Sequence, residues 1–281
     1  MKKDPKISVI MSVYNGLPLG PQPKTKTASS AYLKEAVESI LNQTYRNFEF
    51  IIVDDASRDK SWDYLKSLKD RRIKLIRNKK NLGLAASLNI ALRQAQGDYV
   101  ARMDADDISL PNRFEEQIYF LQKNPTIDLC GTWVDLIDEK GKIIGEKKFP
   151  TDPKKLKRSI TWYTPIVHPT YMAKSRVYKN LNGYRTTFDF AEDYDFLSRA
   201  KNKFHMSNIP RKLLLWRFQD NRRSRSSMQK MDKIDLKIKL DSLKRDGLTI
   251  TGILAAAKKF TMVYFLPFTL KLRIARLLKI A

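Results

Sequence analysis

The feature of this sequence that most constrains its fold is an alternation of strand-like and helix-like segments through the first hundred residues. Short β-rich apolar runs occupy residues 7–13, 48–53, 73–76 and 99–103, and apolar residues at helical spacing occupy 31–42, 61–68 and 84–95. This alternation predicts a parallel sheet covered by helices, with ligands at the carboxyl ends of its strands. The GxGxxG fingerprint is absent after the first strand, which argues against a nicotinamide enzyme.

The segments after Leu110 predict a mixed arrangement of helices and strands. We expect helices from beyond Leu110 to Lys123 and at 154–160, 193–200 and 228–245, with a strand at 127–137 and a turn at 139–142. His205 is expected to lie in a strand and to have no functional role. The segment 17–30, which contains Pro, Gly, Lys, Thr and Ser, predicts a surface loop that borders the site.

Positive charge gathers at the C-terminal end of the chain. The 281 residues carry a formal net charge of +24, and residues 200–281 hold 20 Lys and Arg against 5 Asp and Glu. Such an end attracts polyanions, which include both nucleic acids and anionic lipid headgroups. Aromatic residues are not interleaved with the basic ones as single-strand binding requires, so a nucleic-acid-binding protein is the less favoured hypothesis.

The last stretch, 248–281, combines apolar residues with lysines and arginines and contains no acidic residue. An amphipathic basic segment of this kind favours the surface of an anionic membrane leaflet. The alternative is that its helices pack on the rest of the protein.

The cysteine content and the length of the apolar stretches indicate the compartment in which the protein is expected. Cys130 is the only cysteine, which excludes an intrachain disulfide and predicts a small core residue. The apolar run after Lys2 and Lys3 spans only about seven residues, too few for a signal peptide. Because no stretch of about 18 apolar residues occurs, a membrane-spanning helix is not expected. We therefore expect a cytoplasmic location.

Three carboxylates, Asp104, Asp106 and Asp107, follow the fourth predicted strand. Closely spaced carboxylates are the ligands that hard cations such as Mg²⁺ or Mn²⁺ prefer, and such a cation can offset charge on a diphosphate leaving group. The alternative is an acidic turn in which Asp107 caps the helix after Pro111. Spacing alone leaves both interpretations open.

Other polar residues allow two interpretations each. Asp54 and Asp55 can accept hydrogen bonds from a base or a ribose hydroxyl, or can cap the helix that follows them. Glu192 and Asp193 begin a predicted helix, where a carboxylate can act as a general base toward a hydroxyl or simply interact with the helix dipole. His168 is one of two histidines and is either a packed side chain or a functional one.

Seven segments, taken in order, resemble family-2 glycosyltransferases with a GT-A fold. They are ISVIMSVYNG, YLKEAVESILNQTYRNFEFIIVDDASRD, NKKNLGLAASLNIAL, GDYVARMDADDISLPNRFEEQ, TPIVHPTYM, GYRTTFDFAEDYDFLSRA and LLLWRF. The match spans about residues 6–218, and the joint order is far more specific than any single segment. The resemblance implies a Rossmann-like mixed sheet in a catalytic domain at 1–220, with a nucleotide-sugar half at 1–107 and an acceptor half at 108–220, followed by a basic helical extension at 221–281.

The resemblance also implies roles for individual residues. Asp193 would be the catalytic base, with Glu192 and His168 in the acceptor region. Asp104 and Asp106 match the DxD element of the family, with Asp106 as a ligand of Mg²⁺ or Mn²⁺ and Asp104 nearer the ribose or the metal. Residues assigned to the donor are Val13, Tyr14 and Asn15 at the nucleoside, Asp54 or Asp55 at the base, and Asn81, Gly83, Arg102, Asp104 and Asp106 around them.

The implied reaction is the inverting transfer of a sugar from a nucleotide-sugar, with a UDP-sugar as the first expectation and dTDP- or GDP-linked sugars as alternatives. Asp193 would take the proton of an acceptor hydroxyl as that oxygen attacks the anomeric carbon opposite the diphosphate. The expected acceptor is a saccharide or lipid-linked oligosaccharide of a cell-surface polysaccharide. The expected location is peripheral, on the inner face of the membrane, and transfer to a polyprenyl phosphate is the alternative reaction.

Two departures from the family pattern are visible. The segment 17–30 is longer than is usual between the first strand and the first helix. Gln219 stands where many relatives have a histidine, so the resemblance does not extend to a phosphate or metal contact at that position. The QxxRW signature of processive synthases is also missing, which predicts the transfer of one sugar per encounter.

Overall fold

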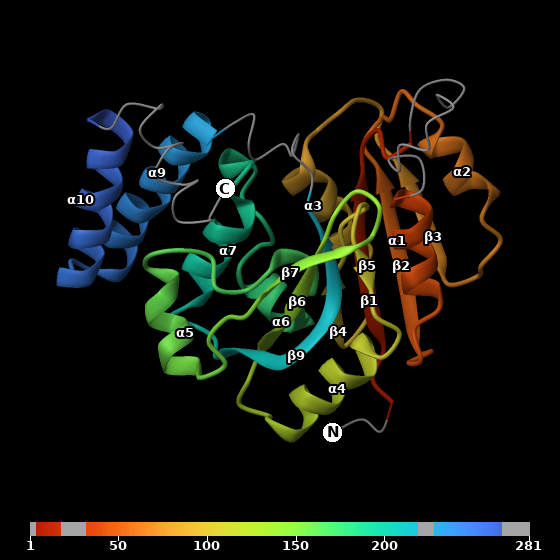
Figure 1. Cartoon of the computed structure of the whole chain (residues 1–281), viewed down its shortest axis with the longest axis horizontal. Helices are drawn as coiled ribbons and strands as arrows, with labels where there is room; N and C mark the ends of the chain where they lie inside the picture. The colour runs from red at the N-terminus through yellow and green to blue at the C-terminus, as the bar shows by residue number, and fades with distance from the viewer. Residues whose placement is uncertain (1–3, 18–31, 219–227, 266–281) are drawn as a thin grey trace.

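A mixed sheet lies at the centre of the molecule (Figure 1). The computed structural model describes residues 4–17, 32–218 and 228–265. Within this part of the chain nine strands form one sheet in the order β3-β2-β1-β4-β8-β6-β9-β5, with β7 paired to β6. Most of the predicted loop at 17–30 lies outside the described residues, as do Gln219 and the end of the chain from residue 266.

The first half has the predicted alternation. Strands β1 (Ile7–Val13), β2 (Phe48–Asp54), β3 (Ile73–Arg77) and β4 (Tyr99–Arg102) are parallel, and the helices between them are α1 (Tyr32–Leu41), α2 (Ser61–Ser67) and α3 (Leu84–Gln94). These bounds agree with the sequence prediction to within one or two residues. The prediction of an α/β fold is confirmed.

Alternate side chains of the inner strands pack into two apolar clusters, one on each face of the sheet. In β2, Phe48, Phe50 and Ile52 join the cluster that also contains buried residues of α1 and α4 (Arg113–Lys123). Ile51 and Val53 point the other way, into the cluster that contains residues of α3 and α7 (Glu192–Ala200). Because both faces are covered, these strands carry apolar residues on both faces rather than a strict alternation of apolar and polar ones.

The second half of the sheet is mixed. Strand β8 (Met172–Lys174) is antiparallel to both β4 and β6 (Leu129–Ile137), and β6 is parallel to β9 (Met206–Arg217). The remaining elements are β5 (Ile108–Ser109), β7 (Ile143–Lys147), α5 (Pro153–Ile160), α6 (Ser175–Asn180) and short 3₁₀ turns at His168–Thr170 and Thr186–Phe188. The predicted turn at 139–142 joins β6 to β7.

Strand β9 is the longest strand among the described residues, and the sequence predicted only a strand at His205, not its extent. Pro210 lies within it, and proline cannot donate to a strand ladder, so its presence argues against a strand. The structure accommodates Pro210 at an irregularity: Ile209 is opposite Thr132 of β6, and the next paired residue, Lys212, is opposite Trp133. His205 immediately precedes β9.

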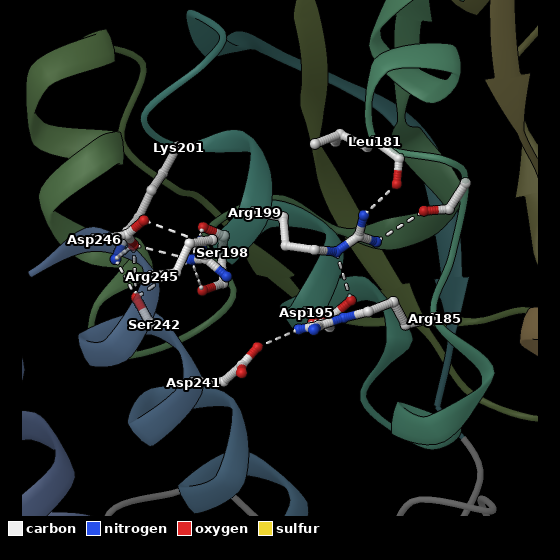
Figure 2. A network of polar contacts seen from close by, with 11 residues as sticks. Leu181, Arg185, Asp195, Ser198, Arg199, Lys201, Asp241, Ser242, Arg245 and Asp246 are labelled. Atoms are coloured by element: carbon white, nitrogen blue, oxygen red, sulfur yellow. Dashed lines mark hydrogen bonds and ion pairs between the residues drawn. The ribbon is translucent and has the colours of Figure 1, made fainter.

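The first helix of the basic C-terminal end packs against the helices that cover the sheet. Helix α9 (Met228–Asp246) packs on α7, and Ile238 of α9 is buried in the cluster that contains residues of α7. Figure 2 shows the polar contacts along this seam, in which Arg185 bonds both Asp195 of α7 and Asp241 of α9. Arg245 of α9 donates to the backbone carbonyl of Ser198 at 2.7 Å.

Helix α10 (Ile250–Tyr264) packs on α9 after a turn at Gly247. The two helices approach closely, since a Cβ atom placed on Gly252 would lie 2.7 Å from the Leu243 side chain. Ala255 and Ala256 are buried, while Ile253, Leu254 and Phe260 are exposed. Among the helices of the described residues, none has the length and apolar character needed to cross a membrane.

Gly131 of β6 offers a test of the packing between the sheet and the turn at 164–170. A Cβ atom at Gly131 would lie 2.1 Å from Cγ2 of Ile166 and 2.6 Å from Oδ1 of Asn208. We expect Gly131→Ala to lower the free energy of unfolding by about 1–3 kcal/mol, because overpacking displaces buried neighbours. Urea denaturation measures this change.

The matched control is Gly145→Ala in β7, where the nearest atom would be Leu136 Cδ1 at an ordinary 3.5 Å. We expect this variant to change stability by less than about 0.5 kcal/mol, as surface substitutions usually do. Equal effects of the two substitutions would contradict the packing described.

Candidate active site

Two cavities meet at the carboxyl ends of β1 and β4, where the strand order 3-2-1-4 reverses its direction. The first, the β1 cavity, has a volume of about 550 Å³, and its wall includes Tyr14, Asn15, Tyr32, Asp55, Asn81 and Gly83. The second, the α7 cavity, has a volume of about 360 Å³, and its wall includes Arg102, His168, Phe190, Glu192, Asp193 and Trp216. Leu84, Asp104 and Asp106 line both cavities.

The chain leaves β1 in a fixed turn that opens the β1 cavity. Asn15 has a positive φ of 52°, its N–H donates to Ser57 Oγ at 3.0 Å, and its Oδ1 accepts from the N–H of Arg58 at 2.8 Å. Tyr14 is 47% exposed beside it. Val13, which was also assigned to the donor, is fully buried in the core and does not line either cavity.

The two aspartates after β2 have different surroundings. Asp55 accepts from the N–H groups of Leu82 and Gly83 at 2.8 and 2.9 Å and from Asn78 Nδ2 at 2.7 Å. It therefore holds the loop that brings Asn81 and Gly83 to the β1 cavity. Asp54 is buried away from both cavities, bonded to the N–H of Ser57 and paired with Arg77.

Arg217, at the end of β9, holds the acidic loop that follows β4. Its guanidinium donates to the backbone carbonyl of Asp106 at 2.9 Å and to Glu35 of α1 at 2.6 Å. Its backbone N–H donates to Oδ1 of Asp107 at 2.8 Å. Asp107 therefore ties the loop to β9, and the N-cap residue of the helix after Pro111 is Asn112 rather than Asp107.

The acidic loop fits a divalent cation. One carboxylate oxygen from each of Asp104, Asp106 and Asp107 lies within 4.8 Å of the others. Asp104 and Asp106 are partly exposed, whereas Asp107 is fully buried. Hard oxygen ligands at this spacing suit Mg²⁺ or Mn²⁺, with Asp104 and Asp106 on the open side. The cation would stand at the border between the two cavities.

Arg102 supplies a buried positive charge beneath this loop. It forms an ion pair with Asp104, and its Nε and Nη1 atoms have no hydrogen-bond partner among the described residues. Burial lowers the pKa of Arg102, but the charge and hydrogen bond of Asp104, together with the nearby Tyr184 and Glu192, raise it above its usual value. The guanidinium therefore remains charged in the wall of the α7 cavity.

Asp193 and Glu192 reach the α7 cavity from the first turn of α7. Asp193 Oδ1 accepts from the N–H of Tyr194 at 2.7 Å, and Glu192 Oε2 accepts from the N–H of Phe190 at 3.1 Å. Burial is the main cause that raises the pKa of both carboxyls, and the negative charge of Asp104 raises the pKa of Asp193 further. A carboxylate with a raised pKa is a stronger general base.

His168 is a buried neighbour of this pair. Its Nε2 lies 2.9 Å from the Tyr184 hydroxyl, and its Nδ1 lies 3.8 Å from Glu192 Oε1. Burial and the charge of Arg102 lower its pKa well below the usual value, so the imidazole is neutral. It forms the cavity wall as a hydrogen-bonding group rather than as a cation.

A third cavity, the α10 groove, continues from the α7 cavity. It has a volume of about 750 Å³ and shares Thr164, Phe190, Asp193 and Met231 with the α7 cavity. The rest of its wall combines aromatic and apolar residues with charged ones. The former are Trp162, Tyr163, Ala191, Tyr194, Ala255 and Met262, and the latter are Asp232, Asp235, Lys239, Lys258 and Lys259. Helices α9 and α10 thus complete a groove that starts at Asp193.

Several residues of the site were not assigned by sequence reasoning. Arg217, Trp216, Phe149, Phe190 and Met231 contact the acidic loop or line the α7 cavity. Arg217 and Trp216 could have been found from the sequence, because both belong to LLLWRF, one of the segments that resemble the family. Met231 lies in the helix predicted at 228–245, for which no role in the site was predicted.

Comparison with known proteins agrees with this geometry. The family model described as "Glycosyl transferase family 2" matches residues 8–181. An uncharacterised glycosyltransferase of Methanocaldococcus jannaschii is 39% identical over 236 residues, covering 81% of this chain and 76% of that protein. The O-antigen biosynthesis glycosyltransferase WbnJ of Escherichia coli is 32% identical over 231 residues, covering 79% and 83%, respectively.

Solved structures show the same fold at low sequence identity. The TarS fragment 1–349 of S. aureus in complex with UDP-GlcNAc has a TM-score of 0.70 at 18% identity, covering 92% of this chain and 73% of the fragment. The mannosyltransferase PcManGT of Pyrobaculum calidifontis, in complex with GDP-Man and Mn²⁺, has a TM-score of 0.63 at 19% identity, covering 95% and 72%. From these matches and the site geometry, the chain is a glycosyltransferase that belongs to family 2 and has the GT-A fold.

Proposed function

We propose that this enzyme transfers a sugar from a nucleotide-sugar to an acceptor hydroxyl with inversion at the anomeric carbon. The observation that carries the proposal is that Asp106 and Asp193, far apart in the sequence, line the same α7 cavity. A leaving-group site and a base on one cavity are what a single displacement needs. The nucleotide would lie in the β1 cavity and the acceptor in the α7 cavity.

Different residues would bind the nucleotide, hold the metal ion and accept the proton. Tyr14 and Asn15, with Asp55 behind them, would line the nucleoside pocket. Asp104 and Asp106 would hold Mg²⁺ or Mn²⁺, which supplies charge stabilisation to a departing diphosphate when bound. Asp193 would accept the proton of the acceptor hydroxyl, and buried Arg102 would keep the surrounding carboxylates ionised.

Donor and acceptor classes rest on different observations. Related structures hold UDP, UDP-GlcNAc or GDP-Man, which supports a nucleotide-sugar donor, with a UDP-sugar as the first choice. The aromatic and apolar residues of the α10 groove next to Asp193 support a saccharide acceptor carried on a lipid. The similarity to an O-antigen biosynthesis enzyme is consistent with an acceptor of the surface-polysaccharide type.

The chain would work at the surface of an anionic membrane. Exposed apolar residues lie along one side of α10, at Ile250, Ile253, Leu254, Phe260 and Tyr264. Lys258 is exposed beside them. Apolar residues immersed among headgroups, with lysines on the phosphates, would place the open end of the α10 groove near a lipid-linked acceptor.

The central test is a panel of nucleotide-sugars assayed for metal-dependent release of nucleoside diphosphate. We expect Asp193→Asn to lower kcat by about 10²–10⁴-fold, because the general base is lost, with little change in donor binding. Asp106→Asn should reduce both the rate and the dependence on Mn²⁺. Release that neither substitution changes would contradict the assigned site, and analysis of the product distinguishes a saccharide hydroxyl from a polyprenyl phosphate as acceptor.

The pH profile provides a second test. Burial raises the pKa of Asp193, and only the ionised carboxylate can take a proton, so kcat should fall as the pH drops through this raised pKa. The acid limb should therefore lie above about pH 4, where an exposed aspartate titrates. A limb at the position of an exposed carboxylate would argue against Asp193 as the base.

Membrane contact by α10 can be tested by flotation with phosphatidylglycerol vesicles. We expect the double substitution Ile250→Ser and Leu254→Ser to lower the vesicle-bound fraction about 10-fold or more, because two apolar side chains leave the membrane. The control replaces Ile143 and Ile144 of β7, which are similarly exposed, with serine. If both double variants bind like the unchanged protein, α10 is not a membrane contact.

A further inference from the structure

A fourth cavity, the basic cavity, lies among α5, α7, α9 and the start of α10, and has a volume of about 630 Å³. Five cationic side chains and one carboxylate line it: Lys154, Lys157, Arg158, Lys201, Lys239 and Asp246. The basic cavity shares no lining residue with the β1 and α7 cavities, and it shares Trp162, Tyr194 and Lys239 with the α10 groove. The proposed transfer reaction gives it no role.

The two inner lysines are already paired within the protein. Lys239 Nζ bonds Asp235 at 2.5 Å and the Tyr194 hydroxyl at 2.7 Å. Lys201 bonds Ser242 at 2.8 Å and lies 3.3 Å from Asp246 (Figure 2). These pairs form the floor of the cavity and fix its shape.

Positive charge in the cavity nevertheless exceeds negative charge. Asp246 serves two cations, since Arg245 also pairs with it at 2.9 Å. Burial lowers the pKa of Lys201, and the nearby charges of Arg245 and Lys157 contribute to this shift although Asp246 opposes it. One carboxylate is therefore too few for the cations around it.

The three cationic side chains of α5 line the solvent-exposed side of the basic cavity. Lys154, Lys157 and Arg158 are exposed, and none of them has a carboxylate partner among residues 4–17, 32–218 and 228–265. They lie on successive turns of one helix, so their charges face a common volume. The N-terminal residues Thr251 and Gly252 of α10, whose helix dipole is positive at this end, close the opposite wall.

Part of the border of the cavity is apolar. Gly247, Thr249 and Thr251 line the cavity, whereas the intervening Leu248 and Ile250 are 80% and 79% exposed. Trp162, which also lines the cavity, is 41% exposed. A cationic hollow bordered by exposed aliphatic and indole side chains suits an anion that carries apolar chains.

We propose that the basic cavity binds a phosphate group, and that the apolar part of its border favours the headgroup of an anionic phospholipid as the source. Lys154, Lys157 and Arg158 contact the phosphate from one side, and the start of α10 faces it from the other. The site anchors the enzyme at one defined point, next to the exposed apolar side of α10 that begins at Ile250. It does not depend on the identity of the donor or the acceptor.

The test variant is Lys154→Gln, Lys157→Gln and Arg158→Gln in the full chain. The matched control removes three positive charges from exposed side chains that do not line the cavity, by Lys69→Gln, Arg71→Gln and Lys155→Gln. Binding is measured by flotation with phosphatidylglycerol vesicles, with phosphatidylcholine vesicles for comparison, and by calorimetric titration with inorganic pyrophosphate. Release of nucleoside diphosphate from a nucleotide-sugar, without vesicles, shows whether each variant is folded and active.

The expected result is that the test variant binds phosphatidylglycerol vesicles about 10-fold or more weakly, since each basic residue near an anionic surface contributes measurably. The control should change by about 2-fold or less, and nucleotide release should be normal in both. Loss of pyrophosphate binding with unchanged vesicle binding also supports a phosphate site but identifies a soluble anion as the source. If the test and control variants weaken both probes equally, or neither weakens any, the proposal is wrong, and the transferase proposal is unaffected.

Discussion

The rest of the site depends on the contacts of one buried group, the guanidinium of Arg217. It joins parts of the chain that lie far apart in sequence: Glu35 of α1, the acidic loop at Asp106, and the carbonyl groups of Asp138 and Glu139 at the β6–β7 turn. Its charge is stacked on the Tyr32 ring, with the guanidinium carbon 3.9 Å from the ring centroid. A buried charge is tolerated only when it is paired and hydrogen-bonded, so these contacts constrain one another. The position of the acidic loop follows from them.

Much of the fold could be predicted because both faces of the first four strands are covered. Their apolar runs and the intervening helices are visible in sequence, and the predicted bounds differ little from those observed. The extent of strand β9 could not be predicted, because Pro210 is accommodated by an irregularity that only its partner β6 reveals. Likewise, the packing of α9 depends on Arg185 and Asp195, whose partners lie on other elements.

The candidate site was predictable to a similar degree. Asp106, Asp193 and His168 line one cavity, as the family pattern implied, because they follow strand ends or begin a helix. Val13 precedes the exposed Tyr14 and Asp54 precedes Asp55, which lines the β1 cavity. Val13 and Asp54 themselves point into the interior, because neighbouring residues of an extended chain alternate in direction. The roles of Arg217 and of the C-terminal helices arise from contacts between distant segments, which spacing along the chain does not encode.

Because Asp104 lines both cavities, binding of a cation in the β1 cavity is thermodynamically linked to the pKa of Asp193 in the α7 cavity. The charge of Asp104 raises the pKa of Asp193, so neutralising Asp104 from the β1 side must lower that pKa. By reciprocity, ionising Asp193 must strengthen the attraction of this region for cations. A cation bound by Asp104 would therefore leave Asp193 less readily protonated than it is when the acidic loop holds no cation.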